Sequence, residues 1–198
     1  MRRRHLLDVA RRLFISQGFH QTGVAQIATE SGIKVGQIYR DFQSKEAIIA
    51  AICDMDMAAW LEEDVLAAAV KDGDLPAIRS WLTRFNQPGD MEEYRLLAEI
   101  MAEAGRNPSV AESFSATDRR VRNSLSAALV AILPGQTDPA VIESLAELVL
   151  TLGIGLASRR IVQGEDRCSL GSRIIERVIT GEARSFFDCR ESRGLDGS

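Results

Sequence analysis

The stretch TGVAQIATESGIKVGQIYRDF, residues 22–42, decides the fold of this chain. Its small residue Ala28 and its glycine Gly32 stand four positions apart. Two short helices that cross at a steep angle need a small residue where they touch and a glycine that can adopt a left-handed turn. The spacing therefore predicts a helix-turn-helix, with one helix that follows the N-cap Thr22 and ends at Gly32, and a second over residues 35–42.

Apolar residues at helical spacing would form the small core of this pair: Val24, Ile27, Ile33, Ile38 and Phe42. The second helix is then left with six residues that face outward, namely Lys34, Val35, Gly36, Gln37, Tyr39 and Arg40. This surface suits the major groove of DNA, because Lys34 can reach guanine acceptors and Gln37 can pair with adenine. Gly36 would let the backbone come close to the duplex.

Phosphate contacts are predicted for the residues around this helix. Tyr39, Arg40 and Lys45 carry donors that can hold the DNA backbone, and Thr22 with the helix N-terminus behind it offers another anchor. Each of these residues alone would be an ordinary solvated side chain. The joint pattern carries the prediction.

The charge of the chain is unevenly distributed. Residues 1–46, here called the head, hold eight Lys or Arg and four Asp or Glu, a balance of +4, whereas the whole chain carries −4. The remainder therefore carries −8. A basic head on an acidic body indicates that the head meets a polyanion, although solvated surface charge would give the same imbalance.

Every other segment also reads as helix, so the predicted fold class is all-α. A first helix over residues 3–17 ends at Gly18, and Phe19 follows as an apolar stop. Ser44 would cap a long helix that continues towards residue 69. Further helices are expected over residues 75–85, 91–105, 109–133 (with an irregularity near Thr117), 139–162 and 170–187.

Composition excludes several classes of protein. Apolar residues at 45% and charged residues at 26% are ordinary globular values, which excludes disordered chains. Cys53, Cys168 and Cys189 lack the spacing of a metal site or a disulfide framework, and the basic N-terminus lacks the apolar run of a signal peptide. We therefore expect a cytoplasmic protein without metal, cofactor or membrane contact. The two histidines, His5 and His20, accompany no nucleophile motif, so no enzyme activity is expected.

Residues 18–49, GFHQTGVAQIATESGIKVGQIYRDFQSKEAII, resemble the N-terminal region of the tetracycline-repressor (TetR) family. The matching positions run in order without a gap: Gly18, Phe19, Thr22, Val24, Ile27, Ala28, Ser31, Gly32, Ile33, Gly36, Ile38, Tyr39, Phe42, Ser44, Lys45 and Glu46. Two positions depart from the pattern. Lys34 stands where a small polar residue is common, and Asp41 would repel phosphates unless Arg40 or Lys45 screens it.

The resemblance implies a helix-turn-helix domain over residues 1–46, a helical regulatory and dimerisation domain over 47–187, and a flexible tail over 188–198. Members of this family are homodimeric transcriptional regulators, many of them repressors that leave a palindromic operator when a small ligand enters the body. A body that binds a protein partner in place of a small molecule is the alternative.

The run LAELVLTLGIGLA, residues 145–157, supports a dimer independently. It is apolar on all faces, so one face must meet something besides its own core, unless the helix is buried within a monomer. The charge-free part, residues 148–158, is too short to span a bilayer. Gly153 and Gly155 fit close helix packing better than a nucleotide loop. The predicted interface residues are Leu145, Val149, Leu152, Leu156, Ile174 and Val178.

Large, adaptable side chains on the body helices are candidates for a pocket that would take a lipophilic or aromatic ligand. They are Met55, Trp60, Trp81, Phe85, Tyr94, Leu97, Met101 and Phe114. A Met and aromatic stripe at helical spacing is also typical of an ordinary core. Arg95, Glu99 and Glu103 are interpreted as a solvated helix face.

Overall fold

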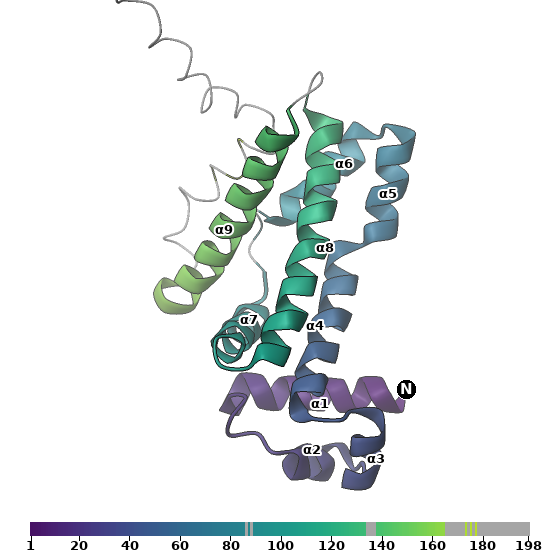
Figure 1. Cartoon of the computed structure of the whole chain (residues 1–198), viewed down its shortest axis with the longest axis vertical. Coiled ribbons are helices and arrows are strands. Elements are labelled where there is room, and N and C mark those ends of the chain that lie inside the picture. Colours follow the sequence, from purple (N-terminus) through teal and green to yellow (C-terminus); the bar gives the residue numbers. More distant parts are fainter. Residues whose placement is uncertain are drawn as a thin grey trace, which may run out of the picture. The chain divides into compact units, whose positions relative to one another are not determined.

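The computed structural model describes residues 1–85, 87, 89–133, 138–164, 173, 175 and 177, and in these residues the regular structure is helical throughout (Figure 1). The predicted all-α class is confirmed. The helices are α1 (Arg2–Gln17), α2 (Val24–Ser31), α3 (Val35–Asp41), α4 (Lys45–Leu61), α5 (Glu63–Asp72), α6 (Leu75–Leu82), the 3-10 turn η1 (Thr83–Phe85), α7 (Met91–Ala104), α8 (Pro108–Ile132) and α9 (Pro139–Gln163).

The chain forms two compact units. The first comprises Met1–Glu62 and Gly89–Val121, so it holds α1 to α4, α7 and the start of α8. The second is built from α5, α6, η1, the rest of α8 and α9. The first unit thus extends beyond residue 46 and includes α4 and α7 together with the head. A domain boundary at residue 46 stays a prediction.

Helix α1 organises the first unit, where it packs against α2, α4 and α7 (Figure 1). Its buried face includes Leu6, Leu13 and Phe14, and each such side chain contributes about 1.5–3 kcal/mol when fully buried. The helix ends at Gly18, whose φ of 85° few other residues adopt. Phe19 then turns back into the core, with its ring centroid 5.3 Å from that of Phe14.

The helix-turn-helix forms as predicted. Gly32 ends α2 in the left-handed conformation, at φ 67° and ψ 13°. The residues predicted for its core are buried (Ile27, Ala28, Ile33, Ile38 and Phe42), and Val24 packs against them. The sequence therefore determined this element locally, through one small residue, one glycine and five apolar positions.

Thr22 does not cap α2, contrary to the prediction. Gly23 occupies the N-cap position, and no side chain caps this helix. The Thr22 side chain is buried, and its Oγ1 lies 3.0 Å from the carbonyl oxygen of Gly18 and 3.2 Å from that of Leu13. Because the last carbonyls of a helix lack partners within it, Thr22 caps the end of α1 instead.

The long helix predicted to reach residue 69 is two helices. Ser44 caps α4 as expected, its Oγ accepting the Ala47 N–H at 3.2 Å. The helix then ends at Leu61, because Glu62 adopts a φ of 44°, and α5 follows. Helix α8, by contrast, passes Thr117 without the predicted interruption. The predicted helix over 170–187 lies outside the described residues except for 173, 175 and 177, and the tail lies wholly outside them.

In the second unit, α5 packs on α6, and α9 contacts η1. Asp74 caps α6 by accepting the Ala77 N–H at 3.0 Å, and the rings of Trp81 and Phe85 meet with centroids 5.5 Å apart. Within the described residues, α9 is the single helix that is long and apolar enough to cross a membrane. Core helices of soluble proteins have the same length and composition, so this is weak evidence for a span.

Candidate DNA-binding interface

Helix α3 presents nearly all of its side chains to solvent. Ile38 is its one buried residue, whereas Lys34, Gly36 and Arg40 are exposed and Gln37 is half-exposed. The two large apolar side chains are also open, since Val35 is 40% and Tyr39 54% exposed. An exposed Val and an exposed Tyr on a seven-residue helix gain little from the core, and both side chains are available for contact with another molecule.

The glycine in the first turn of α3 is not required by packing against the described residues. A Cβ added at Gly36 would meet nothing within 4 Å, and the residue is not among the glycines with positive φ. Glycine within a helix is less favourable than Ala by about 0.5–1 kcal/mol. The close approach of DNA to the backbone at Gly36 stays a prediction.

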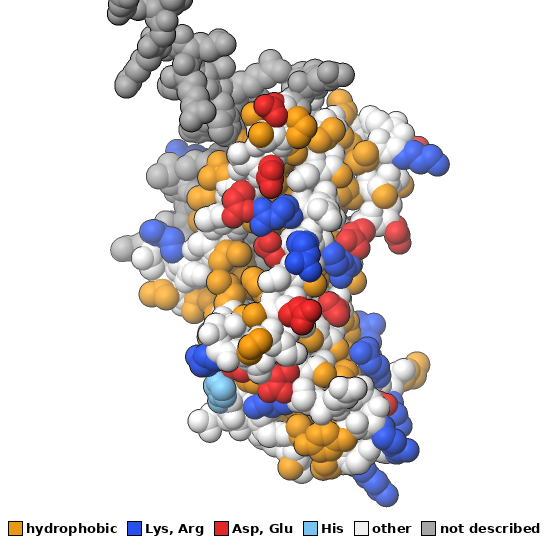
Figure 2. Space-filling model, in the orientation of Figure 1, with side chains coloured by type: hydrophobic (Ala, Val, Ile, Leu, Met, Phe, Trp, Pro, Cys, Tyr) orange, Lys and Arg blue, Asp and Glu red, His pale blue; other side chains and the backbone are white. Residues whose placement is uncertain are grey.

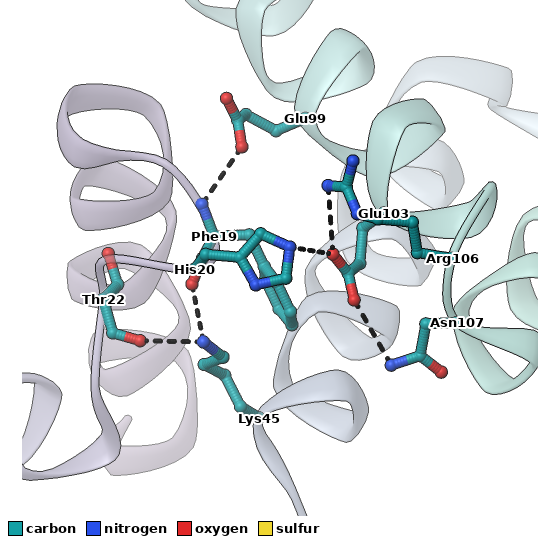
Figure 3. Close-up of polar contacts among 8 residues, drawn as sticks. All are labelled: Phe19, His20, Thr22, Lys45, Glu99, Glu103, Arg106 and Asn107. Carbon is teal, nitrogen blue, oxygen red and sulfur yellow. Dashed lines mark hydrogen bonds and ion pairs between the residues drawn. The ribbon is translucent and has the colours of Figure 1, made fainter.

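Lys45 is half-buried, and its ammonium group has partners within the chain. Its Nζ donates to the carbonyl oxygens of Phe19, at 2.6 Å, and Thr22, at 3.1 Å (Figure 3). The same ammonium group lies 4.2 Å from the centroid of the Phe19 ring, within the range of a cation–π interaction. Its ammonium group therefore ties the start of α4 to the turn between α1 and α2, and phosphate binding by Lys45 stays a prediction.

The prediction for the Thr22 side chain, by contrast, is corrected. Its hydroxyl is buried against the end of α1, so the side chain cannot reach a phosphate. The turn formed by residues 18–22, which precedes the helix-turn-helix, is thus held by a capping hydroxyl and a lysine. We call it the α1–α2 turn below.

Helix α7 holds this turn from the other side. Glu99 Oε2 accepts the backbone N–H of Phe19 at 3.0 Å (Figure 3). Glu103 is 4% exposed, and its Oε2 lies 3.0 Å from Nε2 of His20. Its carboxylate also meets Arg106 at 3.4 Å and Asn107 at 3.3 Å, so its buried charge is compensated.

These contacts correct the interpretation of Glu99 and Glu103 as a solvated face. Glu99 is half-buried and Glu103 buried, and both bind the head. The helical spacing of charged residues could not reveal this, because the partners lie far away in sequence: Phe19 precedes Glu99 by 80 residues. Arg95, on the same helix, is exposed as expected.

Asp41, the acidic departure from the family pattern, is paired with Arg2. Arg2 Nη2 lies 3.0 Å from Asp41 Oδ2, with the two side chains 56% and 27% exposed. The screening thus comes from the start of α1, and not from Arg40 or Lys45. Next to it, the Arg3 guanidinium lies 5.0 Å from the centroid of the Phe42 ring.

The predicted pocket residues fall in both compact units. Trp81 and Phe85 belong to the second, and Met55, Trp60, Tyr94, Leu97, Met101 and Phe114 to the first. Trp81 is buried at 3% exposure, whereas Met101 is exposed at 37%. Met55 and Phe114 pack against the core of the first unit. Tyr94 Oη accepts the Gly89 N–H, so its hydroxyl serves the loop before α7.

The predicted dimer residues on α9 lie largely inside the chain. Leu145, Val149 and Leu156 are 2%, 0% and 6% exposed, so a partner could not reach them, and Leu152 is half-buried. The prediction is corrected for this reason, and Ile174 and Val178 lie outside the described residues. The exposed face of α9 is a different stripe, with members three and four positions apart: Ser144, Leu148, Thr151, Gly155, Ser158 and Val162.

No other chemistry gathers in the described part of the chain. There, no group of three or more His, Cys, Asp or Glu side chains could hold a metal ion. Cys53 is half-buried, and burial, with smaller effects from Asp54 and Asp56, raises the pKa of its thiol to about 12. Because the thiolate is the reactive form, Cys53 is a poor nucleophile at neutral pH.

The fold and the exposed α3 face define a helix-turn-helix DNA-binding regulator. Residues 6–52 match the family model of bacterial regulatory proteins of the tetR family, and residues 75–179 match that of the BetI-type transcriptional repressor C-terminal domain. The chain therefore belongs to the TetR family of transcriptional regulators.

Relatives agree with this assignment. The transcriptional regulator UidR of Escherichia coli (strain K12) is 36% identical over 114 residues, and the match spans about half of either chain, 55% of each. Among solved structures, Salmonella enterica GusR has the same fold, with a TM-score of 0.68 and 24% identity over 90% of this chain and 95% of that one. A regulator from Saccharomonospora viridis, solved in complex with choline, has a TM-score of 0.62 and 18% identity over 89% and 94%.

Proposed function

We propose that this chain is a cytoplasmic, homodimeric repressor that binds a palindromic operator through α3 and is released by a small lipophilic or aromatic ligand. The observation that carries the proposal is the exposure of the α3 face on a helix-turn-helix whose apolar core residues are buried. Lys34 and Gln37 are its base-reading residues, Val35 can contact a thymine methyl group, and Tyr39 and Arg40 hold phosphates.

The dimer is supported by α9. Its exposed stripe consists of small and apolar side chains, with Leu148 36% and Val162 82% exposed. A Cβ at Gly153 or Gly155 would meet nothing within 4 Å, so packing against the described residues gives no reason for either glycine. A second copy whose helix crosses α9 closely at this point accounts for both, and a two-fold dimer implies a palindromic operator.

One buried hydroxyl group supports the proposal that the chain binds a ligand. Thr117 is 7% exposed, and its Oγ1 has no hydrogen-bond partner among the described residues. Buried hydroxyl groups nearly always have a partner, so an unsatisfied one requires an explanation. Thr117 lies one helical turn after Phe114, a predicted pocket residue, and a polar group of a bound ligand would satisfy it.

Helix α7 provides a route from such a ligand to DNA. Three of the predicted pocket residues lie on it (Tyr94, Leu97 and Met101), and Glu99 and Glu103 of the same helix hold the α1–α2 turn. A ligand that shifts α7 would therefore displace the turn that leads into the helix-turn-helix. Such coupling requires only that the ligand bind the two positions of α7 with different affinity.

The test uses the purified full chain in two steps. Selection from random duplex DNA should recover a palindrome, occupied by two chains per site. Thermal shift against lipophilic and aromatic compounds, with choline included, should then find a compound that raises the unfolding midpoint and lowers operator affinity. Recovery of no preferred sequence would contradict operator recognition. A preferred palindrome without any stabilising compound would favour the alternative, a body that binds a protein partner.

A further inference from the structure

Three consecutive arginines occupy a position that does not favour them. Arg2, Arg3 and Arg4 form the first turn of α1, and all three are exposed. The N-terminal end of a helix carries partial positive charge, so cations there are destabilising. No acidic residue lies in this turn, and no side chain caps it. The placement of three cations in this turn therefore needs a reason other than helix stability.

Two contacts place this turn beside the recognition helix. Arg2 pairs with Asp41, the last residue of α3, at 3.0 Å, and the Arg3 guanidinium lies on the ring of Phe42, 5.0 Å from its centroid. The start of α1 is thereby attached to the end of α3, although 39 residues separate Arg2 from Asp41.

The result is a surface rich in basic side chains. Figure 2 shows Lys and Arg side chains gathered along the edge formed by α3 and the start of α1. Besides the three arginines, Lys34 and Arg40 are exposed here. Asp41 does not interrupt the surface, because Arg2 compensates its charge. A basic strip that continues a base-reading helix fits the sugar–phosphate backbone of the same duplex.

We propose that the arginines of residues 2–4 bind DNA phosphates next to the segment that α3 reads, and that Asp41 is a positioning residue that holds Arg2 there. The family model matches from residue 6 onward, so it does not include this cluster. The inference rests on the DNA-binding function and adds to it a second contact surface that strengthens binding without reading bases.

The first test compares two doubly substituted full-length chains on the selected operator and on an unrelated duplex. Arg3→Ala/Arg4→Ala removes two of the proposed contacts. Arg79→Ala/Arg119→Ala removes two exposed arginines of the body as a matched control. Each lost phosphate contact lowers the slope of log K against log salt by about 0.9, so the head variant should lose about 1.8 per chain. It should lose the same factor in affinity on both duplexes.

A slope equal to that of the control variant would overturn the proposal. Loss of folding is excluded by the unfolding midpoint, which should stay close to that of the unsubstituted chain, because the lost contact of Arg3 with the Phe42 ring is offset by the removal of two charges that oppose the helix dipole. If the unsubstituted chain selects no operator, the proposed function fails. If it binds and only the slope prediction fails, this inference alone is wrong.

The second test isolates Asp41. If Asp41 holds Arg2, Asp41→Asn should weaken binding in the otherwise unsubstituted chain. In an Arg2→Ala background the carboxylate has lost its partner and repels phosphate, so the same Asp41→Asn change should strengthen binding. An equal gain in both backgrounds would show that Asp41 only repels DNA, which contradicts its positioning role.

Discussion

Lys45 and Arg40 carry the same charge five positions apart, yet the structure gives them different surroundings. Arg40 is exposed on α3, whereas the Lys45 ammonium donates to two backbone carbonyls and lies on the Phe19 ring. A residue type that suits phosphate binding is therefore not enough to assign it. The sequence could not distinguish the surroundings of the two residues, because the carbonyl groups that bind Lys45 belong to the α1–α2 turn, more than 20 residues away in sequence.

Salt titration separates their roles. Lys45→Ala should lower the free energy of unfolding by about 1–2 kcal/mol, because it removes charged hydrogen bonds from a half-buried site. It should leave the salt slope of DNA binding unchanged. Arg40→Ala should preserve stability and reduce the slope by about 0.9. If Lys45→Ala reduced the salt slope and left the stability unchanged, Lys45 would be the phosphate contact.

Thr117→Val tests the ligand proposal at a single hydroxyl. Valine has a closely similar shape, and removal of an unsatisfied buried hydroxyl is neutral or stabilises the fold by up to about 1 kcal/mol. If a ligand satisfies this group, the variant should be at least as stable as the unsubstituted chain. It should nevertheless bind the stabilising compound more weakly, as measured by calorimetry. Equal affinity in both proteins would remove Thr117 from the site.

At the scale of elements, the helix bounds near the head could be predicted and two features of the body could not. Ser44, Gly18 and Gly32 are local signals that mark helix ends. The break between α4 and α5 has no such signal, because a Glu, and no Gly or Pro, adopts the left-handed turn. The exposed stripe of α9 was missed because the helix is apolar on all faces, so the pattern did not indicate which face meets the core.

Helix α7 should control the order of the α1–α2 turn. Glu99→Ala removes the acceptor of the Phe19 N–H, so hydrogen exchange at that amide should accelerate and operator affinity should fall. Glu93→Ala, an exposed carboxylate on the same helix, provides the matched control and should change neither quantity. Unchanged exchange at Phe19 in the Glu99 variant would mean that α7 does not hold the turn.

At the scale of the whole molecule, the dimer depends on the face of α9 that the chain leaves exposed. Leu148→Glu places a charge in the proposed interface and should shift the mass measured by light scattering from dimer to monomer, with the secondary structure retained. Leu145→Ala, one helix position from the exposed stripe but buried at 2% exposure, should cost about 2–5 kcal/mol of stability and leave the dimer intact. A monomer in the Leu145 variant and a dimer in the Leu148 variant would contradict the corrected interface.

The central claim is that the exposed face of α3 chooses the DNA sequence. The direct measurement is the affinity of Lys34→Ala and Gln37→Ala for the selected operator and for a set of operators with single base-pair changes in each half-site. A good base contact contributes about 1–3 kcal/mol of discrimination, so each variant should lose preference at its own position and keep it at the others. If both variants retain the full preference of the unsubstituted chain at every position, α3 does not read the operator.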